Sequence, residues 1–349
     1  MQHVEHQFAI PRLRHYVQGW IVLLALPGFL WYAVTLGPLR AAAFNAVTSE
    51  RSYLANLREP ELACRSLSLR RPRVVVIGDS HSYAGWNFSQ LQRTLERRVG
   101  ACAIGGLYAD SLPALIDFVA EAADDAKLLV LGLSPRMFWD SPTKQAQMEH
   151  HSALIASLTP NARPFFRRAV LGEPLPYDGE YGSIARHAKL IESLDENAIS
   201  DRLSESRDTI LSLRDWAKRL EDVRTTSVAD KVVPAICDAV RRSGARLWVV
   251  HVPESPYLES RYSPEVWHAY RSAIDALSPC AERILVAPAR ALDLGNRHYV
   301  NRALDDAHDY AAWRRPGAIH DEKAFDADHL NPVGAERFTR EALSRLTAP

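Results

Sequence analysis

The chain has 349 residues, of which 47% are hydrophobic and 24% charged, and this composition excludes an intrinsically disordered protein. Its 42 basic and 42 acidic side chains cancel, so the charge does not indicate a nucleic-acid partner. A mean hydropathy of −0.19 excludes a membrane protein with many spans and leaves room for one.

The first predicted element is a transmembrane anchor. Residues 17–36 carry no charge and have about the 20 residues that cross the hydrocarbon core of a bilayer. Trp20 lies near one end of this run, and Trp31 and Tyr32 lie near the other, as in an interfacial aromatic belt. The run therefore predicts a single membrane-spanning helix.

The residues that flank the apolar run predict its orientation. Basic residues, Arg12 among them, precede it and favour a cytoplasmic N-terminus. We expect residues 1–46 to form a cytoplasmic tail and a single-pass anchor in the inner (cytoplasmic) membrane, with residues 47–349 on the outer, periplasmic side. The alternatives are a buried core helix or a cleaved signal peptide, because Pro27-Gly28 interrupts the run and small residues follow it.

Four cysteines lie in the part predicted to be exported, and none has the close spacing of a metal knuckle or redox pair. An even number of cysteines in an exported domain permits disulfides. We expect the pairs Cys64–Cys102 and Cys237–Cys280, which is one of three possible connectivities. The alternative is four buried free thiols.

Beyond a connector of short helical turns at residues 47–72, strands and helices alternate. Short apolar runs predict strands, and segments with helical spacing of apolar residues lie between them. The strands lack polar alternation, as expected when helices cover both faces of a parallel sheet. We therefore predict a doubly wound α/β fold with about five strands. The strands are expected at 74–77, 101–104, 127–131, 246–252 and 283–287, and the helices at 87–98, 111–123, 232–242, 264–277 and 332–346.

Residues 140–225 interrupt this alternation. Several prolines between residues 140 and 190 leave no clear period, and residues 197–223 have an amphipathic helical stripe. We expect a helical insertion here. Within it, residues 163–168 combine aromatic and cationic side chains, which predicts either a membrane contact or an ordinary helix end.

Ser80 is the first candidate for catalysis, because it follows the predicted strand 74–77 in the sequence Gly78-Asp79-Ser80. Ligands bind at the carboxyl ends of strands in an open parallel sheet. A serine at a strand-to-helix turn there can present its hydroxyl beside backbone N–H groups, and Gly78 permits a sharp turn. The alternative is that Ser80 merely caps the next helix.

The second candidate is the segment Asp326-Ala-Asp-His329, just before the helix predicted at 332–346. A serine hydroxyl needs a base to remove its proton, and histidine is the usual base near neutral pH. A carboxylate must orient that histidine, and Asp326 can supply it locally, with Asp328 as the alternative. The other interpretation is a solvated acidic loop that caps a helix.

Together, Gly78-Asp79-Ser80 and Asp326-Ala-Asp-His329 resemble the two catalytic blocks of the SGNH hydrolases, also called the GDSL family. The predicted sheet, SGNH- or flavodoxin-like, extends the resemblance over about residues 72–140 and 228–349. The resemblance implies that Ser80 is the nucleophile, His329 the base and Asp326 the acid that orients it.

The chain departs from the family pattern at the residues that would stabilise an oxyanion. The glycine of the family's second block corresponds to Gly106 or to Ala109. The usual asparagine of the third block is missing, so Ser134 or Asn87 would have to donate instead. Loss of one such donor can lower turnover about 10²- to 10³-fold. His81 stands where the family commonly has leucine, and we expect it to pack or hydrogen-bond locally.

The anchor, the insertion and the sequence Gly132-Leu-Ser-Pro-Arg136 are similar to the membrane-tethered branch of this family. That similarity implies a serine esterase or O-acyltransferase acting on acyl groups, often acetyl, of a cell-envelope or secreted polysaccharide. Its partners would be the acylated polysaccharide or acyl donor and a membrane-bound acyltransferase. The alternative is a non-catalytic protein that binds polysaccharide or holds such an acyltransferase.

No cofactor is expected, and no set of metal ligands is visible at ligand spacing, so a metal-dependent hydrolase is not predicted. Glu149, His150 and His151 are adjacent, but no partner pair accompanies them, and a solvated surface pair of histidines is expected. His251 lies within a predicted strand and is expected to be a core residue with satisfied hydrogen bonds.

Overall fold

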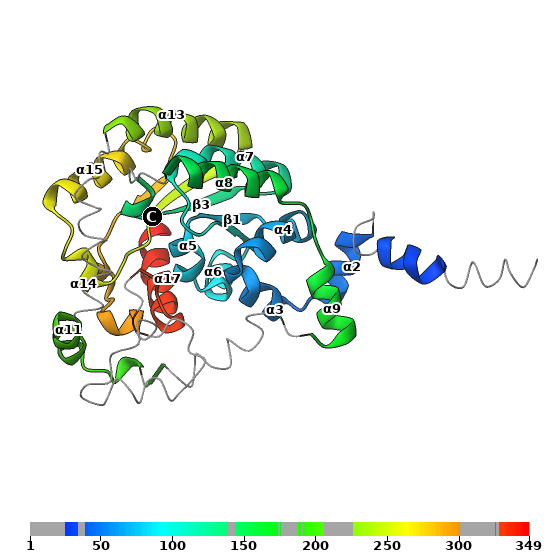
Figure 1. The fold of residues 1–349 in the computed structure, drawn as a ribbon, viewed down its shortest axis with the longest axis horizontal. Coiled ribbons are helices and arrows are strands. Elements are labelled where there is room, and N and C mark those ends of the chain that lie inside the picture. The colour runs from blue at the N-terminus through cyan, green and yellow to red at the C-terminus, as the bar shows by residue number, and fades with distance from the viewer. Residues whose placement is uncertain are drawn as a thin grey trace, which may run out of the picture.

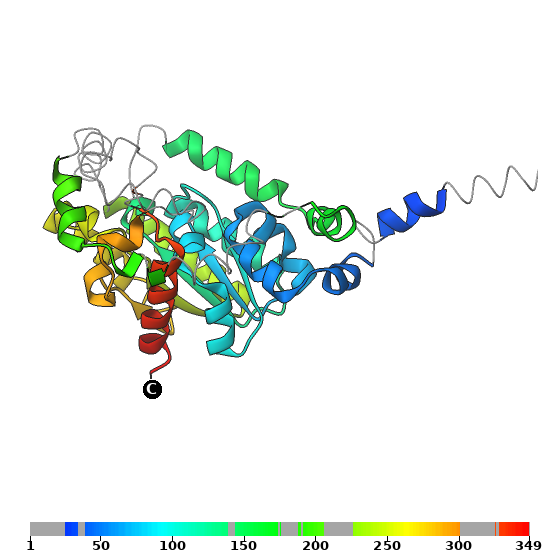
Figure 2. The ribbon, with the colours of Figure 1, turned by 90° about the horizontal axis from the view of Figure 1, so that it is seen from below.

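The computed structural model describes residues 25–33, 39–138, 144–173, 175, 188–189, 191–205, 226–300, 325 and 328–348. Within them, a five-stranded sheet lies between two layers of helices, and the N-terminal segment extends away from one side (Figures 1 and 2). This is the doubly wound α/β architecture that the alternation of strands and helices predicts.

The sheet is parallel throughout, and its strands lie in the order β2-β1-β3-β4-β5. In this flavodoxin-like order β2 and β3 lie on opposite sides of β1. In such sheets the crevice for a ligand is expected outside the carboxyl ends of the strands where the order reverses, which here are β1 and β3. The strands are β1 (Val74–Gly78), β2 (Val99–Ala103), β3 (Leu128–Leu133), β4 (Arg246–His251) and β5 (Arg283–Leu285).

The core has two halves, one on each face of the sheet. Val74 and Val76 of β1 pack into one half, and Val75 and Ile77 pack into the other, because successive side chains of a strand point to opposite faces. All four side chains are fully buried. The first half includes side chains of α6 (Phe88–Leu95) and α17 (Pro332–Leu346), and the second includes those of α7 (Leu112–Ala122), α13 (Thr226–Ser243) and α15 (Pro264–Asp275).

The last helix, α17, has the bounds that the sequence predicts. Pro332 occupies its first turn, where a missing N–H costs nothing, and the side chain of Asn331 accepts a hydrogen bond from the backbone N–H of Gly334 at 2.9 Å. The helix packs against α5 (Ser80–Gly85) and α6. It thereby brings the end of the chain beside the turn that follows β1.

The segment before β1 differs from the prediction of short helical turns. It contains α3 (Glu50–Ala55), the 3-10 turn η1 (Asn56–Arg58) and the longer helix α4 (Pro60–Arg70), which packs on the edge strand β2. β2 itself begins two residues earlier than predicted, at Val99. The small side chains of β2 give only a weak sequence signal for a strand. Gly100 has to be small because a Cβ there would press against Pro72 and Leu67.

The predicted insertion between β3 and β4 is helical where the structure describes it, in α8 (Lys144–Ser157), α9 (Arg163–Leu171) and α11 (Glu196–Glu205). The rest of the stripe predicted at 197–223 lies outside the described residues. In α9, Phe165 is buried and stacks edge-on against Phe44 of α2 (Arg40–Val47) at 4.7 Å between ring centroids. These aromatic side chains therefore pack inside the protein.

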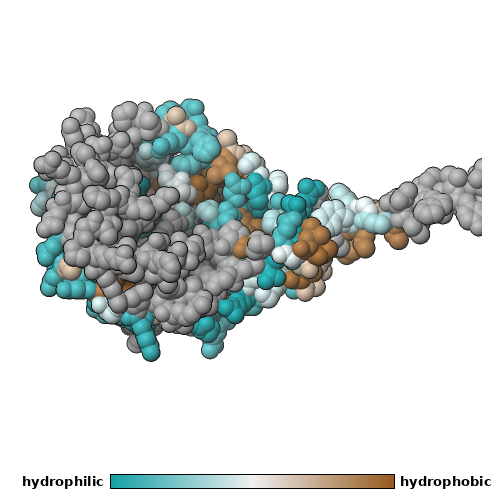
Figure 3. All heavy atoms as spheres, turned by 60° about the horizontal axis from the view of Figure 1, so that its bottom comes forward, coloured by the Kyte–Doolittle hydropathy of each residue, from teal (hydrophilic) through white to brown (hydrophobic). Residues whose placement is uncertain are grey.

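The predicted anchor lies mostly outside the described residues, which include only 25–33 of its apolar run, as a helix. Across the part of the chain that the structure describes, no helix is both long and apolar enough to span a bilayer. Exposed apolar side chains nevertheless gather along the N-terminal projection (Figure 3), among them Leu26, Phe29, Leu30, Trp31, Tyr32 and Leu39.

Both predicted disulfides are confirmed. Cys64 of α4 is bonded to Cys102 of β2, and Cys237 of α13 is bonded to Cys280, which follows α15. The first pair fastens a helix to the edge strand, and the second joins two helices of one layer. Neither pair leaves a free thiol among these four cysteines.

Candidate active site

The turn after β1 requires glycine at its first position. Gly78 has a φ of +147°, and a Cβ there would collide with the Ser82 hydroxyl and the backbone carbonyl of Gly132. The chain therefore leaves the sheet abruptly and enters α5 within two residues. Ser80 is the first residue of this helix and is 9% exposed.

Asp79 organises the turn from beneath Ser80. Its carboxylate caps α5 by accepting the backbone N–H of His81 at 3.0 Å, and it also accepts from the His81 ring nitrogen Nδ1 at 3.0 Å. A third hydrogen bond comes from the Ser134 hydroxyl at 2.8 Å. Because Ser134 follows β3, these bonds tie together the two strand ends that flank the crevice.

His81 is buried, and its surroundings favour the charged form of its imidazole. Burial lowers the pKa of its imidazole, but the charge of Asp79, their hydrogen bond and the charge of Glu254 outweigh burial and raise the pKa to about 9. Burial raises the pKa of Asp79, and the stronger combined effect of His81 and Ser134 leaves that pKa below its usual value. His81 thus hydrogen-bonds locally, as predicted, and forms a buried ion pair with Asp79.

His329 lies next to this ion pair. Its ring centroid is 5.1 Å from that of His81, with the planes tilted by 31°. His81 is adjacent to Ser80 in the chain, so two segments about 250 residues apart in the sequence meet at the start of α5. The loop before α17 therefore reaches the carboxyl ends of the strands, beside the turn that carries Ser80.

Of the two aspartates in that loop, the structure describes only Asp328. Asp326 lies outside the described residues. Asp328 forms a salt bridge with Arg136, which belongs to the 3-10 turn η3 (Pro135–Phe138) after β3. Burial lowers the pKa of Arg136, but the charges of Asp328 and Asp79 outweigh it and keep the guanidinium firmly charged. The Asp328 carboxylate is thus committed to anchoring the loop to β3.

The two alternatives for the second oxyanion block lie in the connection from β2 to α7. The backbone N–H of Ile104 donates to the carbonyl of Gly78 at 3.0 Å, so this connection leaves the sheet directly beside the Ser80 turn. Gly106 is exposed at φ +68°, and Ala109 is fully buried at the start of the 3-10 turn η2 (Ala109–Ser111). The backbone N–H of Gly106 or of Ala109 stays the predicted donor of this block.

Ser134 does not fit the predicted role of oxyanion donor. Its hydroxyl is fully buried and gives its proton to the Asp79 carboxylate. A serine hydroxyl has only one proton to donate. The donor that the family's third block would supply is therefore used to position the turn.

Asn87 also has a structural role that the sequence did not predict. Its side-chain oxygen caps α6 by accepting the backbone N–H of Gln90 at 3.0 Å, and its own backbone N–H donates to Thr339 of α17 at 2.8 Å. We interpret Asn87 as a helix cap that also fastens α6 to α17.

Two substitutions at Asn87 distinguish a cap from an oxyanion donor. Asn87→Ala should lower the free energy of unfolding by about 1 kcal/mol, because it removes a cap. Asn87→Asp keeps the accepting oxygen but lacks the amide donor, so it should leave stability and ester hydrolysis nearly unchanged. Denaturant unfolding and esterase rates check both. A loss of about 10²-fold or more in Asn87→Asp would instead assign Asn87 to the oxyanion.

Sequence reasoning missed several residues around this site. Glu254 follows β4, is fully buried, and lies with Oε1 3.7 Å from Nε2 of His81. Its contact with α5 depends on the path of the chain after β4, which no local pattern reveals. The prediction of a solvated His150-His151 pair is wrong for His151, which is 5% exposed and lies 6.5 Å from the Tyr108 ring, because α8 turns that side chain inward.

No protein-family model, no curated protein and no solved structure matches this chain.

Proposed function

We propose that the protein is a membrane-anchored serine esterase or O-acyltransferase of the SGNH type, acting on acyl groups of a cell-envelope or secreted polysaccharide. The observation that carries the proposal is the placement of His329 against His81, the neighbour of Ser80, at the carboxyl end of β1. A hydroxyl at a helix start and an imidazole from a distant loop are the components of nucleophilic acyl transfer.

In the proposed reaction, the Ser80 hydroxyl oxygen attacks the carbonyl carbon of an acyl ester while His329 accepts its proton. The backbone N–H of Ser80 and that of Gly106 or Ala109 in the β2–α7 connection stabilise the oxyanion. The alcohol leaves with the proton from His329, which gives an acyl-enzyme on Ser80. Water or a sugar hydroxyl then loses its proton to His329 and takes the acyl group, and His329 returns that proton to the Ser80 oxygen as it leaves. Water gives hydrolysis, and a sugar hydroxyl gives transfer.

Two features support a site outside the cytoplasm. Disulfides such as Cys64–Cys102 and Cys237–Cys280 persist mainly in oxidising compartments. The exposed apolar residues of the N-terminal projection continue onto α9, where Val170 and Leu171 are 68% and 64% exposed. These surfaces lie on the side from which the proposed anchor leaves the domain, and a membrane surface would cover them.

A non-catalytic role in binding polysaccharide or a membrane acyltransferase is the second candidate. The observation that favours it is the commitment of Ser134 to Asp79, because this leaves the third oxyanion block without its usual side-chain donor. Such a protein would retain the fold and the crevice at β1 and β3 without an activated serine.

A fluorophosphonate probe, which reacts with activated serines, tests the catalytic proposal. The wild-type chain should be labelled, and Ser80→Ala should lose the label completely, because the attacking oxygen is gone. Ser82→Ala is the matched control, since it removes another hydroxyl of α5 and should leave labelling intact. An unlabelled wild type, under conditions that label a known serine esterase, would favour the binding protein.

A further inference from the structure

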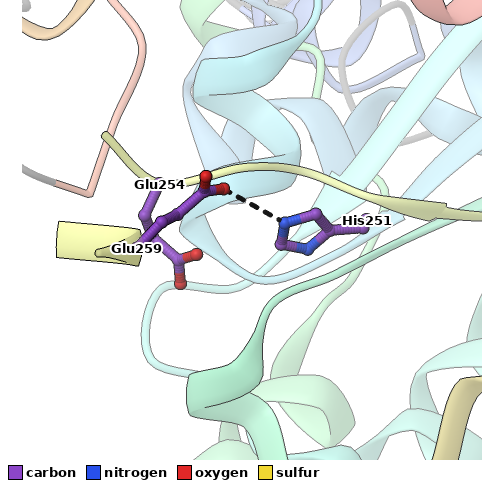
Figure 4. A group of neighbouring side chains, drawn as sticks. All are labelled: His251, Glu254 and Glu259. Atoms are coloured by element: carbon purple, nitrogen blue, oxygen red, sulfur yellow. Dashed lines mark ion pairs between the residues drawn. The ribbon is translucent and has the colours of Figure 1, made fainter. Parts of the chain in front are cut away.

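Three side chains that sequence analysis did not connect meet after β4. His251 is the last residue of β4, Glu254 comes from the following coil, and Glu259 from the end of α14 (Pro256–Glu259) (Figure 4). One nitrogen or oxygen atom of each residue lies within 4.8 Å of those of the other two. The residues are 0%, 0% and 8% exposed, so solvent does not screen their charges.

The hydrogen bonds of Tyr270 determine which nitrogen of His251 carries a proton. The Tyr270 hydroxyl donates its single proton to the carbonyl of Leu133 at 3.0 Å. The same oxygen lies 2.8 Å from Nδ1 of His251, and we assign Nδ1 as the donor in that contact because the tyrosine proton is used. The lone pair of a neutral His251 ring is therefore on Nε2, which is 3.5 Å from Oε1 of Glu259. Histidines that bind metals are commonly oriented in this way through their other nitrogen.

The two carboxylates lack enough donors for their charge. Both oxygens of Glu259 share one backbone N–H, that of Ala289, at 2.9 and 3.1 Å. Neither oxygen of Glu254 has a donor at full hydrogen-bond distance among the described residues, although Nε2 of His81 lies 3.7 Å away and the buried Tyr262 hydroxyl is also a neighbour. A buried carboxylate with so few donors is costly. The His81 ring faces Glu254 from one side, but on the other side its neighbours are a second carboxylate and the imidazole of His251. A positive charge between the three groups would remove this cost.

We propose that His251, Glu254 and Glu259 bind one divalent metal ion of the first transition row, such as Zn²⁺ or Mn²⁺. One imidazole nitrogen and two carboxylates suit these ions better than Ca²⁺ or Mg²⁺, which take mainly oxygen ligands. The ion fixes the coil after β4 and holds Glu254 facing His81. It thereby stabilises the contact between this coil and the start of α5. This proposal does not require Ser80 to be a nucleophile.

The test measures metal content directly. The full-length chain is purified in detergent with a tag that does not bind metals, stripped with a chelator, loaded separately with Zn²⁺ or Mn²⁺ and desalted. Elemental analysis should find about one ion per chain, and loading should raise the thermal unfolding midpoint, because a ligand that binds the folded state stabilises it. The X-ray absorption spectrum of the zinc-loaded protein should show one imidazole among oxygen ligands.

Two variants of the same type separate this site from nonspecific binding. Glu254→Gln keeps the side-chain volume and should lose both the bound ion and the thermal shift. Glu192→Gln changes a glutamate that lies 3.5 Å from Nε2 of His298, outside the cluster, and should keep both. Circular dichroism checks that each variant is folded. If Glu254→Gln does not fold, the X-ray absorption spectrum of the zinc-loaded wild type tests the proposal instead, because it shows whether an imidazole binds the ion.

A wild-type chain that retains no stoichiometric ion overturns the proposal, as does a Glu254→Gln variant that retains as much ion as the wild type. A metal-free wild type that is less stable than Glu254→Gln is the expected result, because the variant removes a buried charge that only the ion compensates. Loss of fluorophosphonate labelling with intact metal binding would contradict the proposed esterase activity alone.

Discussion

If the proposed activity is correct, His329→Ala is expected to lower kcat/KM for acyl-ester hydrolysis by a factor on the order of 10⁴ to 10⁶, as loss of the base does in serine hydrolases. The physical reason is that the Ser80 hydroxyl holds its proton firmly near neutral pH unless a nearby base accepts it. His329 is the histidine that the loop before α17 places beside the Ser80 turn, 5.1 Å from the His81 ring. Steady-state kinetics with an acetyl ester measures this change.

Three controls give that result its meaning. His268→Ala makes the same chemical change on the exposed face of α15 and should leave the rate unchanged. The double variant Ser80→Ala/His329→Ala should be no slower than Ser80→Ala, because groups that act as a unit are not additive. Added imidazole should restore part of the activity of His329→Ala, which a structural role would not produce. If His329→Ala stays within about tenfold of the wild type, another group is the base.

The strands and helices that could be predicted have strong local signals. The run Val74-Val-Val-Ile77 followed by glycine fixes β1, and Asn331-Pro332 fixes the start of α17, because a cap and a proline act at one position. The predicted start of β2 lies two residues too late, because Val99 and Gly100 show no distinct apolar pattern. α4 was underestimated because its sequence alternates small polar and apolar residues without a clear stripe.

The functional residues divide in the same way. Ser80 and His329 stand out because they occur in short motifs next to predictable elements. The hydrogen bond of Ser134 could not be predicted, because its hydroxyl reaches Asp79 only when β1 and β3 lie side by side. The meeting of His251 with Glu254 and Glu259 depends on a coil that doubles back after β4, and the spacing of these residues along the chain gives no sign of it.

The second large effect is expected from removal of the disulfide between Cys64 and Cys102. This bond closes a loop with a sequence separation of 38 residues, and chain-entropy arguments give it about 4 kcal/mol of stabilisation. The double variant Cys64→Ala/Cys102→Ala should therefore shift the denaturant unfolding midpoint of the full-length chain far below that of the wild type. Reduction of the wild type breaks both disulfides and should shift the midpoint further.

Cys237→Ala/Cys280→Ala is the matched control, because that pair closes a loop of nearly equal length, with a separation of 43 residues. Loop entropy alone predicts equal losses for the two double variants. Cys64 and Cys102 are 2% and 0% exposed within the core, so the first variant also loses packing against α4 and β2 and should be the less stable one. Equal stability of the first variant and the wild type would show that packing of α4 on β2 suffices to hold the edge strand. A larger loss in the first variant should also slow fluorophosphonate labelling, since β2 leads directly into the connection that carries Gly106 and Ala109.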